Sequence, residues 1–391
     1  MTTLPRFIQV HTLHNYPAAL LNRDDAGLAK RLPYGDKVRT RISSQCLKRH
    51  WRVADDAFSL SALAKRKGME LEQRSTYFMD EVKKKLINQS VPEAIAIGAV
   101  EGLIEALKLN RDSKKKEKIK TSEVILLGEK EVDYLFKFTL DIAKQQTDAK
   151  AVHKALKDAV ETSGKEFKEN LKTMLAESGL VSAMFGRMVT SDVLTSRDAA
   201  VYVAHAFTVH EAQVENDYFT VVDDLLRDVG EQGSAGIFDT ELASGLYYGY
   251  VVVDVQQLLA NLGGEDRELA GQIVHHLLHL IATVSPGAKR GSTAPFEWAK
   301  FMLVEAGDWQ PRSLAGAFQN ALDTKGNKIR ERAVGQLANE LERLDAAYGA
   351  PCERRFLSVD DVQVPGAERM PLAALTQWVQ ERIANGATQG A

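Results

Sequence analysis

The chain has 391 residues, of which 45% are hydrophobic and 26% are charged, and its formal net charge is −3. This composition is typical of a soluble globular protein with two or three domain-sized units. No stretch approaches the roughly 18 apolar residues of a membrane span. The first residues also lack a basic segment followed by a long apolar run, so we expect a cytoplasmic protein without membrane contact. Cys46 and Cys352 are too few for a disulfide framework or a cysteine zinc site.

The positive charge gathers at the N-terminus. Residues 1–52 hold 10 Lys and Arg against 3 Asp and Glu, whereas residues 181–391 hold 17 against 28. A nearly neutral chain that concentrates its cations in this way is expected to bind a polyanion on one face of the protein.

The first elements predict how that face is built. Alternating side chains indicate a strand over 6–13, and a basic loop over 15–42 precedes a helix over 43–58. On this helix Gln45, Lys48, Arg49 and Arg52 share one face, while Leu47, Trp51, Ala54 and Phe58 share the other. Ser43 or Ser44 is a good N-cap, and free backbone N–H groups at a helix start suit phosphates.

Residues 59–180 show Lys- and Glu-rich helical periodicity and predict an inserted helical subdomain. Its lysine run at 113–120 is expected to be a solvated loop, with contact to nucleic acid as the less favoured alternative. Strand-like residues return at 182–192 and at 199–210. A polar, glycine-containing excursion over 211–240 leads to the clearest strand, at 245–258.

The C-terminal part predicts a helix over 266–284 and a strand over 297–307. Further helices are expected over 313–323, 327–347 and 371–385. The order of elements favours an α+β fold with a ferredoxin-like βαββαβ sheet and long insertions.

Histidine and carboxylate patterns give weak signals for catalysis. His11 or His14 could act as the general base of a ribonuclease, but no nucleophile–base–orienter set lies nearby. His205 and His210 lack a third metal ligand, and His275, His276 and His279 are expected to be ordinary helix residues. Asp223 and Asp224 could bind magnesium, although loop solvation is the simpler account.

The loop 285–293, with two glycines around Lys289 and Arg290, could wrap a phosphate or be an ordinary turn.

The chain resembles the CasC family, the backbone subunit of the type I-E CRISPR Cascade surveillance complex. The stretches that carry the resemblance keep the order of the family and spread over most of the chain. They are "LNRDD" at 21–25, "RISSQCLKR" at 41–49, "GRMVTSD" at 186–192, "AHAFTVH" at 204–210, "DYFTVVDDL" at 217–225 and "PGAKR" at 286–290.

The resemblance implies a right-hand shape with a ferredoxin-like palm, helical fingers and a thumb hairpin. Residues 1–58, 181–210 and 241–391 would be palm, residues 59–180 fingers and residues 211–240 thumb. Implied RNA contacts are Arg23, Lys30, Arg41, Ser43, Gln45, Lys48, Arg49, Arg52, Arg187, Met188, Lys289 and Arg290, with Met188 packed against bases. Tyr218, Phe219 and Val222 match thumb positions at a displaced nucleotide, where the family often has tryptophan in place of Tyr218.

The resemblance therefore implies a non-enzymatic scaffold without cofactor or metal. Its partners would be CRISPR RNA, target DNA through the guide, other Cascade subunits, and copies of itself in a head-to-tail filament. Two alternatives stay open. One is a CRISPR-RNA-processing endoribonuclease with His11 or His14 as base, and the other is a scaffold that holds only protein.

Overall fold

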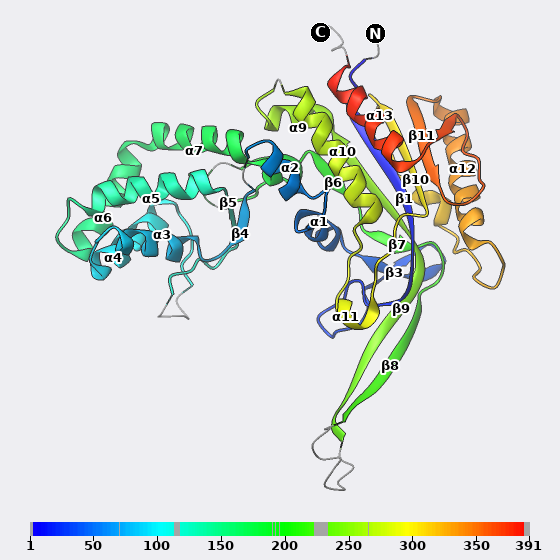
Figure 1. The fold of residues 1–391 in the computed structure, drawn as a ribbon, viewed down its shortest axis with the longest axis horizontal. Coiled ribbons are helices and arrows are strands. Elements are labelled where there is room, and N and C mark those ends of the chain that lie inside the picture. The colour runs from blue at the N-terminus through cyan, green and yellow to red at the C-terminus, as the bar shows by residue number, and fades with distance from the viewer. Residues whose placement is uncertain are drawn as a thin grey trace. The chain divides into compact units, whose positions relative to one another are not determined.

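The structure is a computed structural model that describes residues 3–69, 71–112, 118–189, 191, 193–194, 196–222, 234–264 and 266–386. It divides into two compact units. The first, the sheet unit, contains residues 1–59, 201–255 and 267–391, and the second, the helical unit, contains residues 60–200 and 256–266. Figure 1 shows the mixed α and β content of the chain.

The sheet unit is built on a largely antiparallel sheet in the order β12-β11-β10-β1-β9-β7-β3-β2, and β6 and β8 also pair with β9. Only the described pair β11 and β12 is parallel. The strands are β1 (Phe7–Ala19), β2 (Arg31–Tyr34), β3 (Lys37–Ile42), β6 (Val201–Val203), β7 (Ala206–Thr208), β8 (Gln213–Val222), β9 (Ser234–Asp254), β10 (Phe301–Gly307), β11 (Cys352–Ser358) and β12 (Ala367–Arg369).

Helices cover both faces of this sheet. They are α1 (Ser44–Arg52), α10 (Arg267–Thr283), α11 (Arg290–Thr293), the 3-10 helix η2 (Ala315–Phe318), α12 (Ile329–Tyr348) and α13 (Leu372–Ala384). Because successive strand residues point to opposite faces, Leu13 and Tyr248 pack in the core with α12, whereas Tyr16 and Tyr247 pack in the core with α1.

The helical unit has its own core, formed largely by α3 to α7. Its elements are α2 (Leu60–Arg66), β4 (Gln73–Ser75), α3 (Phe78–Asn88), α4 (Glu93–Ala106), β5 (Ile125–Leu127), α5 (Glu129–Ala143), α6 (Ala149–Thr162), α7 (Gly164–Ser178) and α8 (Leu180–Phe185), with most of α9 (Val255–Asn261). Gly98 and Gly102 let α4 and α6 approach closely, since a Cβ at Gly102 would lie 2.7 Å from the carbonyl oxygen of His153.

Two sequence predictions near the N-terminus are wrong in their bounds. The expected loop over 15–42 contains the end of β1 and the β2–β3 pair, whose short strands carry no alternating apolar signal. The expected helix over 43–58 ends at Arg52, because the Asp56 carboxylate accepts the Phe58 N–H at 2.8 Å and stabilises a turn instead.

Three later predictions also differ from the structure. Residues 182–185 lie in helix α8 rather than in a strand, and the entire helix is buried, so neither a helical nor a strand period is visible. Residues 181–200 belong to the helical unit, not to the sheet unit. The expected helix over 313–323 is reduced to η2, and β9 starts at Ser234, within the excursion.

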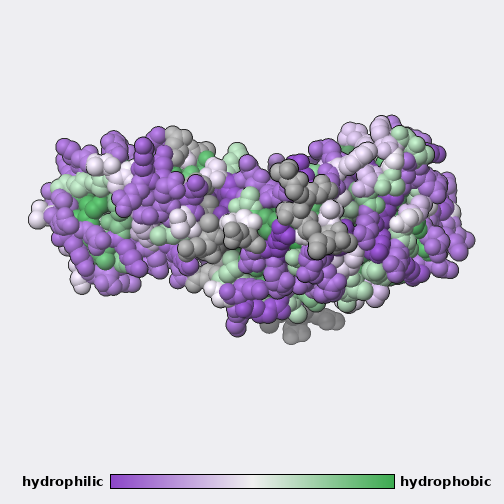
Figure 2. All heavy atoms as spheres, turned by 90° about the horizontal axis from the view of Figure 1, so that it is seen from above, coloured by the Kyte–Doolittle hydropathy of each residue, from purple (hydrophilic) through white to green (hydrophobic). Residues whose placement is uncertain are grey.

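Hydrophilic residues cover most of the face that Figure 2 shows, with hydrophobic residues in small areas between them. Within the described ranges, no helix has the length and apolar character needed to cross a bilayer. Residues 113–117 of the lysine run lie outside the described residues.

Candidate nucleic-acid interface

Ser43, one of the two serines that the sequence offers as N-cap, caps helix α1. Its hydroxyl accepts a hydrogen bond from the Cys46 N–H at 3.3 Å, and its own N–H donates to Asn22 Oδ1 at 2.9 Å. Ser43 and Ser44 are each 8% exposed. The hydroxyl predicted to contact RNA thus also caps the helix.

The two faces of α1 have opposite character. Trp51 is 3% exposed, and together with Leu47 it lines a small space against Tyr16 and Ile42 of the sheet. The opposite face carries the predicted polar set. Gln45 and Arg49 are exposed, and Lys48 and Arg52 are half-buried. The basic stripe is therefore present on the surface of a firmly docked helix.

A basic group lies beside the start of α1, in the turn before β2. Arg23 pairs with Ala29 in a β-bridge, and the Arg41 N–H donates to the Lys30 carbonyl at 2.8 Å. Arg41 Nη1 also donates to His205 Nδ1 at 2.8 Å. Burial, and then the charges of Arg41 and Lys30, lower the pKa of His205, so this ring is uncharged at neutral pH and accepts the guanidinium hydrogen bond.

Lys289 joins the loop after α10 to the hairpin of β8 and β9. Its Nζ donates to Thr240 Oγ1 and lies 5.4 Å from the centroid of the Phe219 ring, a cation–π contact. Its backbone has a left-handed φ of 52°, which is uncommon for a residue other than glycine. The loop and hairpin residues predicted separately thus meet at one place.

Arg290 brings the same loop close to α1. His50 of α1 donates from Nδ1 to the Cys46 carbonyl at 2.8 Å. Burial lowers the pKa of His50, the charges of Arg290 and Arg49 lower it further, and a hydrogen bond with the backbone of Gly287 in this loop opposes them. The loop therefore extends the basic face of the helix.

The predicted excursion over 211–240 contains an antiparallel hairpin of β8 and β9, seen at the lower end of the sheet unit in Figure 1. Tyr218 is 64% exposed and Phe219 is 38% exposed. As neighbours on a strand, Tyr218 and Phe219 point to opposite faces of the hairpin. A partner bound on one face can therefore contact only one of the two rings. The side chain of Val222 and residues 223–233, with Asp223 and Asp224, lie outside the described residues.

Glu241, which carries no sequence signal, anchors the base of this hairpin. It is 7% exposed, and its Oε1 accepts the Ala29 N–H at 2.7 Å while Oε2 pairs with the Arg31 guanidinium. The turn that carries Arg23 and Lys30 is thereby tied to the hairpin. We call the set formed by α1, this turn, loop 286–293 and the hairpin base the basic surface.

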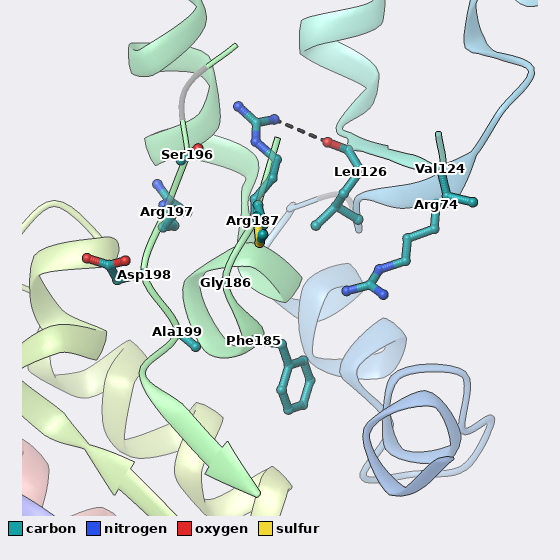
Figure 3. A pocket seen from close by; sticks show the side chains of 11 residues that line it. Arg74, Val124, Leu126, Phe185, Gly186, Arg187, Ser196, Arg197, Asp198 and Ala199 are labelled. Carbon is teal, nitrogen blue, oxygen red and sulfur yellow. Dashed lines mark hydrogen bonds between the residues drawn. The ribbon is translucent and has the colours of Figure 1, made fainter. Parts of the chain in front are cut away.

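Arg187 is almost completely buried, and this position disagrees with its predicted RNA contact. The residue is 3% exposed, and its Nη1 donates to Glu131 Oε1 at 2.7 Å and to the Leu126 carbonyl at 3.2 Å. The second of these bonds is drawn in Figure 3. A buried guanidinium neutralised by a carboxylate cannot reach a phosphate. Its neighbour Met188, by contrast, is 94% exposed.

His11 is a structural residue. It is fully buried, its Nε2 donates to Glu305 Oε2 at 3.1 Å, and its Nδ1 accepts from the Tyr248 hydroxyl at 2.9 Å. Burial lowers the pKa of His11 more than Glu305 raises it. The Glu305 carboxylate also accepts bonds from Arg312 and Arg354, so this network has no room for a substrate.

His14 is half-buried beside Tyr16, and burial lowers its pKa to about 4. A base so weak accepts a proton poorly at neutral pH. Among the described residues, no group of three or more His, Cys, Asp and Glu is arranged to hold a metal ion.

We expect His279 to make the stability of the sheet unit depend on pH. Its ring stacks on Phe58 with centroids 3.5 Å apart, and burial, helped by His275 and His276, lowers its pKa to about 4. An unfolded histidine has a pKa of about 6.5, so below that pH the unfolded chain binds the proton first. We expect the free energy of unfolding to fall between pH 6.5 and 4, by up to about 1.4 kcal/mol per pH unit for this group. Urea titrations across this range measure the slope, and a His279→Gln variant that keeps the full slope would contradict the assignment.

The fold defines a mixed α+β protein with an inserted helical unit and a projecting hairpin. Its basic surface is suited to binding a polyanion. The chain belongs to the CT1975-like protein family, whose model matches residues 8–381. A comparison with curated proteins found no match.

Similar chains occur in solved structures of surveillance complexes, among them the following two. A chain of "CRISPR RNA-guided surveillance complex, pre-nicking" has 25% sequence identity and a TM-score of 0.76, with 96% of this chain and 99% of that chain covered. A chain of "CRISPR RNA-guided surveillance complex" has 23% identity and a TM-score of 0.67, with 95% and 99% covered, which shows likeness of fold.

Proposed function

We propose that this protein binds CRISPR RNA as a subunit of a Cascade-type surveillance complex. More narrowly, it acts as a type I-E backbone subunit of the CasC kind, whose copies line up head to tail along the guide. It works without catalysis and holds the guide for pairing with target DNA, together with other Cascade subunits. The observation that carries the proposal is the basic surface, where α1, Lys30, Arg41, Lys289 and Arg290 gather in one unit of a chain whose net charge is negative.

The chemistry of this surface suits a guide of any sequence. Guanidinium and ammonium groups bind phosphates, which gives affinity and position without base readout. Sequence is then read by pairing between guide and target, as in other RNA-guided systems. A subunit that must hold every spacer needs this kind of contact.

The topology supports the narrower assignment of a ferredoxin-like palm. The strands β10, β1, β9 and β6 lie in the order expected for a βαββαβ sheet, and α1 and the end of α10 line the same space on one face. The helical unit then corresponds to fingers and the hairpin of β8 and β9 to a thumb.

The buried state of His11 and the low pKa of His14 argue against the endoribonuclease alternative, because neither ring is placed as a general base. The decisive experiment incubates purified protein with labelled repeat RNA of increasing length. We expect binding that strengthens with length and leaves the RNA intact. A single cleavage product would favour the endoribonuclease, and failure to bind any RNA would favour a protein-only scaffold.

The thumb role of the hairpin gives a further expected result. In a double Tyr218→Ala, Phe219→Ala variant, thermal stability should change little, because both rings are exposed and the cation–π contact of Phe219 with Lys289 is worth only about 0.5–1 kcal/mol at an exposed site. Base–aromatic contacts are worth about 1–3 kcal/mol each, so cooperative assembly on long RNA should weaken. Chemical probing should lose its regular pattern of reactive, displaced nucleotides. A variant that melts early and keeps that pattern would instead identify the two rings as core residues.

A further inference from the structure

The hairpin of β8 and β9 projects beyond the sheet (Figure 1). Strand β9 pairs with β1 as far as Ala243, and among the described strands its part from Ser234 to Leu242 pairs with β8 alone. At about 3.4 Å per residue, this part extends roughly 30 Å beyond the sheet. A two-stranded ribbon is only marginally stable in water by itself, so contacts at its base decide where its far end lies.

Two polar residues, Thr240 and Glu241, lie at this base. As neighbours on β9 they point to opposite faces of the hairpin. Both are nearly inaccessible, at 8% and 7% exposure. Each of them bonds to a different segment of the sheet unit, so the ribbon is held from both faces.

The first face is held by Lys289. Its Nζ donates to Thr240 Oγ1 and lies against the Phe219 ring, so the lysine runs along this face of the hairpin. The loop that carries it is fixed in turn, because the Ala288 N–H donates to the Leu20 carbonyl at 2.8 Å, just after the end of β1. Movement of the hairpin on this face therefore breaks a bond to the body of the sheet unit.

The opposite face is held by Glu241. Its Oε1 accepts the Ala29 N–H at 2.7 Å, and its Oε2 pairs with the Arg31 guanidinium. Ala29 is 4% exposed and lies in the turn that carries Arg23 and Lys30. Because Oε1 is bound to a backbone N–H, the hairpin cannot change direction without breaking this bond or moving the turn with it.

We propose that Thr240 and Glu241 form a two-sided clasp that fixes the direction of the hairpin relative to the basic surface. The inference rests on the proposed function and deepens it. The clasp determines where the far end of the hairpin meets the RNA, and so it keeps the displaced nucleotides at regular intervals. Glu241 is a positioning residue and not an RNA ligand, since a carboxylate repels phosphates.

The test compares Glu241→Ala with Glu241→Gln, of which the second keeps an acceptor for the Ala29 N–H. The Arg31 side chain is 35% exposed, so water can solvate its charge in either variant and the fold should persist. Asp360→Asn is the matched control. Asp360 pairs with Arg330 at 2.6 Å in the same unit but outside the hairpin, and the exposed fractions of the two side chains, 11% and 38%, are similar to those of Glu241 and Arg31.

The first measurement needs no RNA. In a chain whose two cysteines are replaced by serine, spin labels at Tyr218→Cys in the hairpin and Glu342→Cys in α12 report the distance from the hairpin to the rest of the sheet unit. We expect Glu241→Ala to broaden the distance distribution and Glu241→Gln to broaden it less. Thr240→Val, which opens the other face of the clasp, should broaden it as well. An unchanged distribution in Glu241→Ala, or equal broadening in Asp360→Asn, overturns the proposal.

The second measurement uses guide RNA. Glu241→Ala should weaken the regular pattern of reactive nucleotides in chemical probing, whereas the slope of log K against log salt should not become flatter, because no cation is lost. A pattern that stays regular overturns the positioning role, and a steeper slope would then show that the carboxylate only neutralises Arg31. Wild-type protein without a regular pattern would contradict the thumb role in the proposed function, while the distance measurement still decides on the clasp.

Discussion

Replacing Lys48, Arg49 and Arg52 together with alanine should remove a large part of the RNA affinity of this protein. All three cations lie on the outward face of α1. The charges of Arg290 and Arg49 both lower the pKa of His50, so the electrostatic potentials of α1 and of loop 286–293 overlap at this residue. Each lost phosphate contact flattens the salt dependence of log K for a single strand by about 0.7, which makes about 2 for the triple variant. The loss should be equal for unrelated RNA sequences, since phosphates carry no sequence information.

A matched variant separates this effect from a change in net charge. Lys325→Ala, Lys328→Ala, Arg343→Ala removes three exposed cations at and before α12, on the opposite face of the sheet from α1. It should bind RNA with the wild-type slope. Basic residues in the last turn of a helix contribute about 0.3–1 kcal/mol, so the α1 variant should remain folded, which a thermal melt checks. Equal slopes for the two variants would show that α1 does not hold phosphates.

The elements predicted well from the sequence are those with one apolar stripe and a clear cap. Helix α1 shows its docking face in Leu47 and Trp51, and its start in Ser43. Strand β11 was not predicted, since it contains Arg354, which is 2% exposed and pairs with Glu305 across the sheet. A charged residue inside a strand hides the alternation that marks a buried face, and its partner is far away in the sequence.

The candidate site shows the same division. The cations of α1 could be found from spacing within one helix, which local geometry determines. The contacts of Arg41 with His205 and of Glu241 with Arg31 could not, because tertiary pairing sets them and the partners are more than 150 residues apart. Lys289 was predicted in part. The composition of its loop indicated a phosphate site, but its contact with Phe219 could not be predicted, because that contact depends on the tertiary fold.

Arg187 should prove essential to the fold of the helical unit rather than to RNA binding. Both members of its pair with Glu131 are nearly inaccessible, and the same carboxylate also accepts the Gly128 N–H at 3.0 Å at the start of α5. Removing one member of a buried pair leaves the other charge without compensation, which typically costs about 3–5 kcal/mol. Arg187→Met should therefore unfold at much lower urea concentration, while its folded fraction binds RNA with an unchanged salt slope.

A double variant tests whether the lost stability comes from the uncompensated charge of Glu131. Arg187→Met combined with Glu131→Gln removes both charges, and the glutamine can still accept the Gly128 N–H, so the pair of changes should destabilise far less than the sum of the single changes. The double-mutant cycle, measured by urea unfolding, gives the coupling directly. If Arg187 were instead a phosphate ligand, Arg187→Met would keep nearly normal stability and flatten the salt slope, and Glu131→Gln would have no bearing on either.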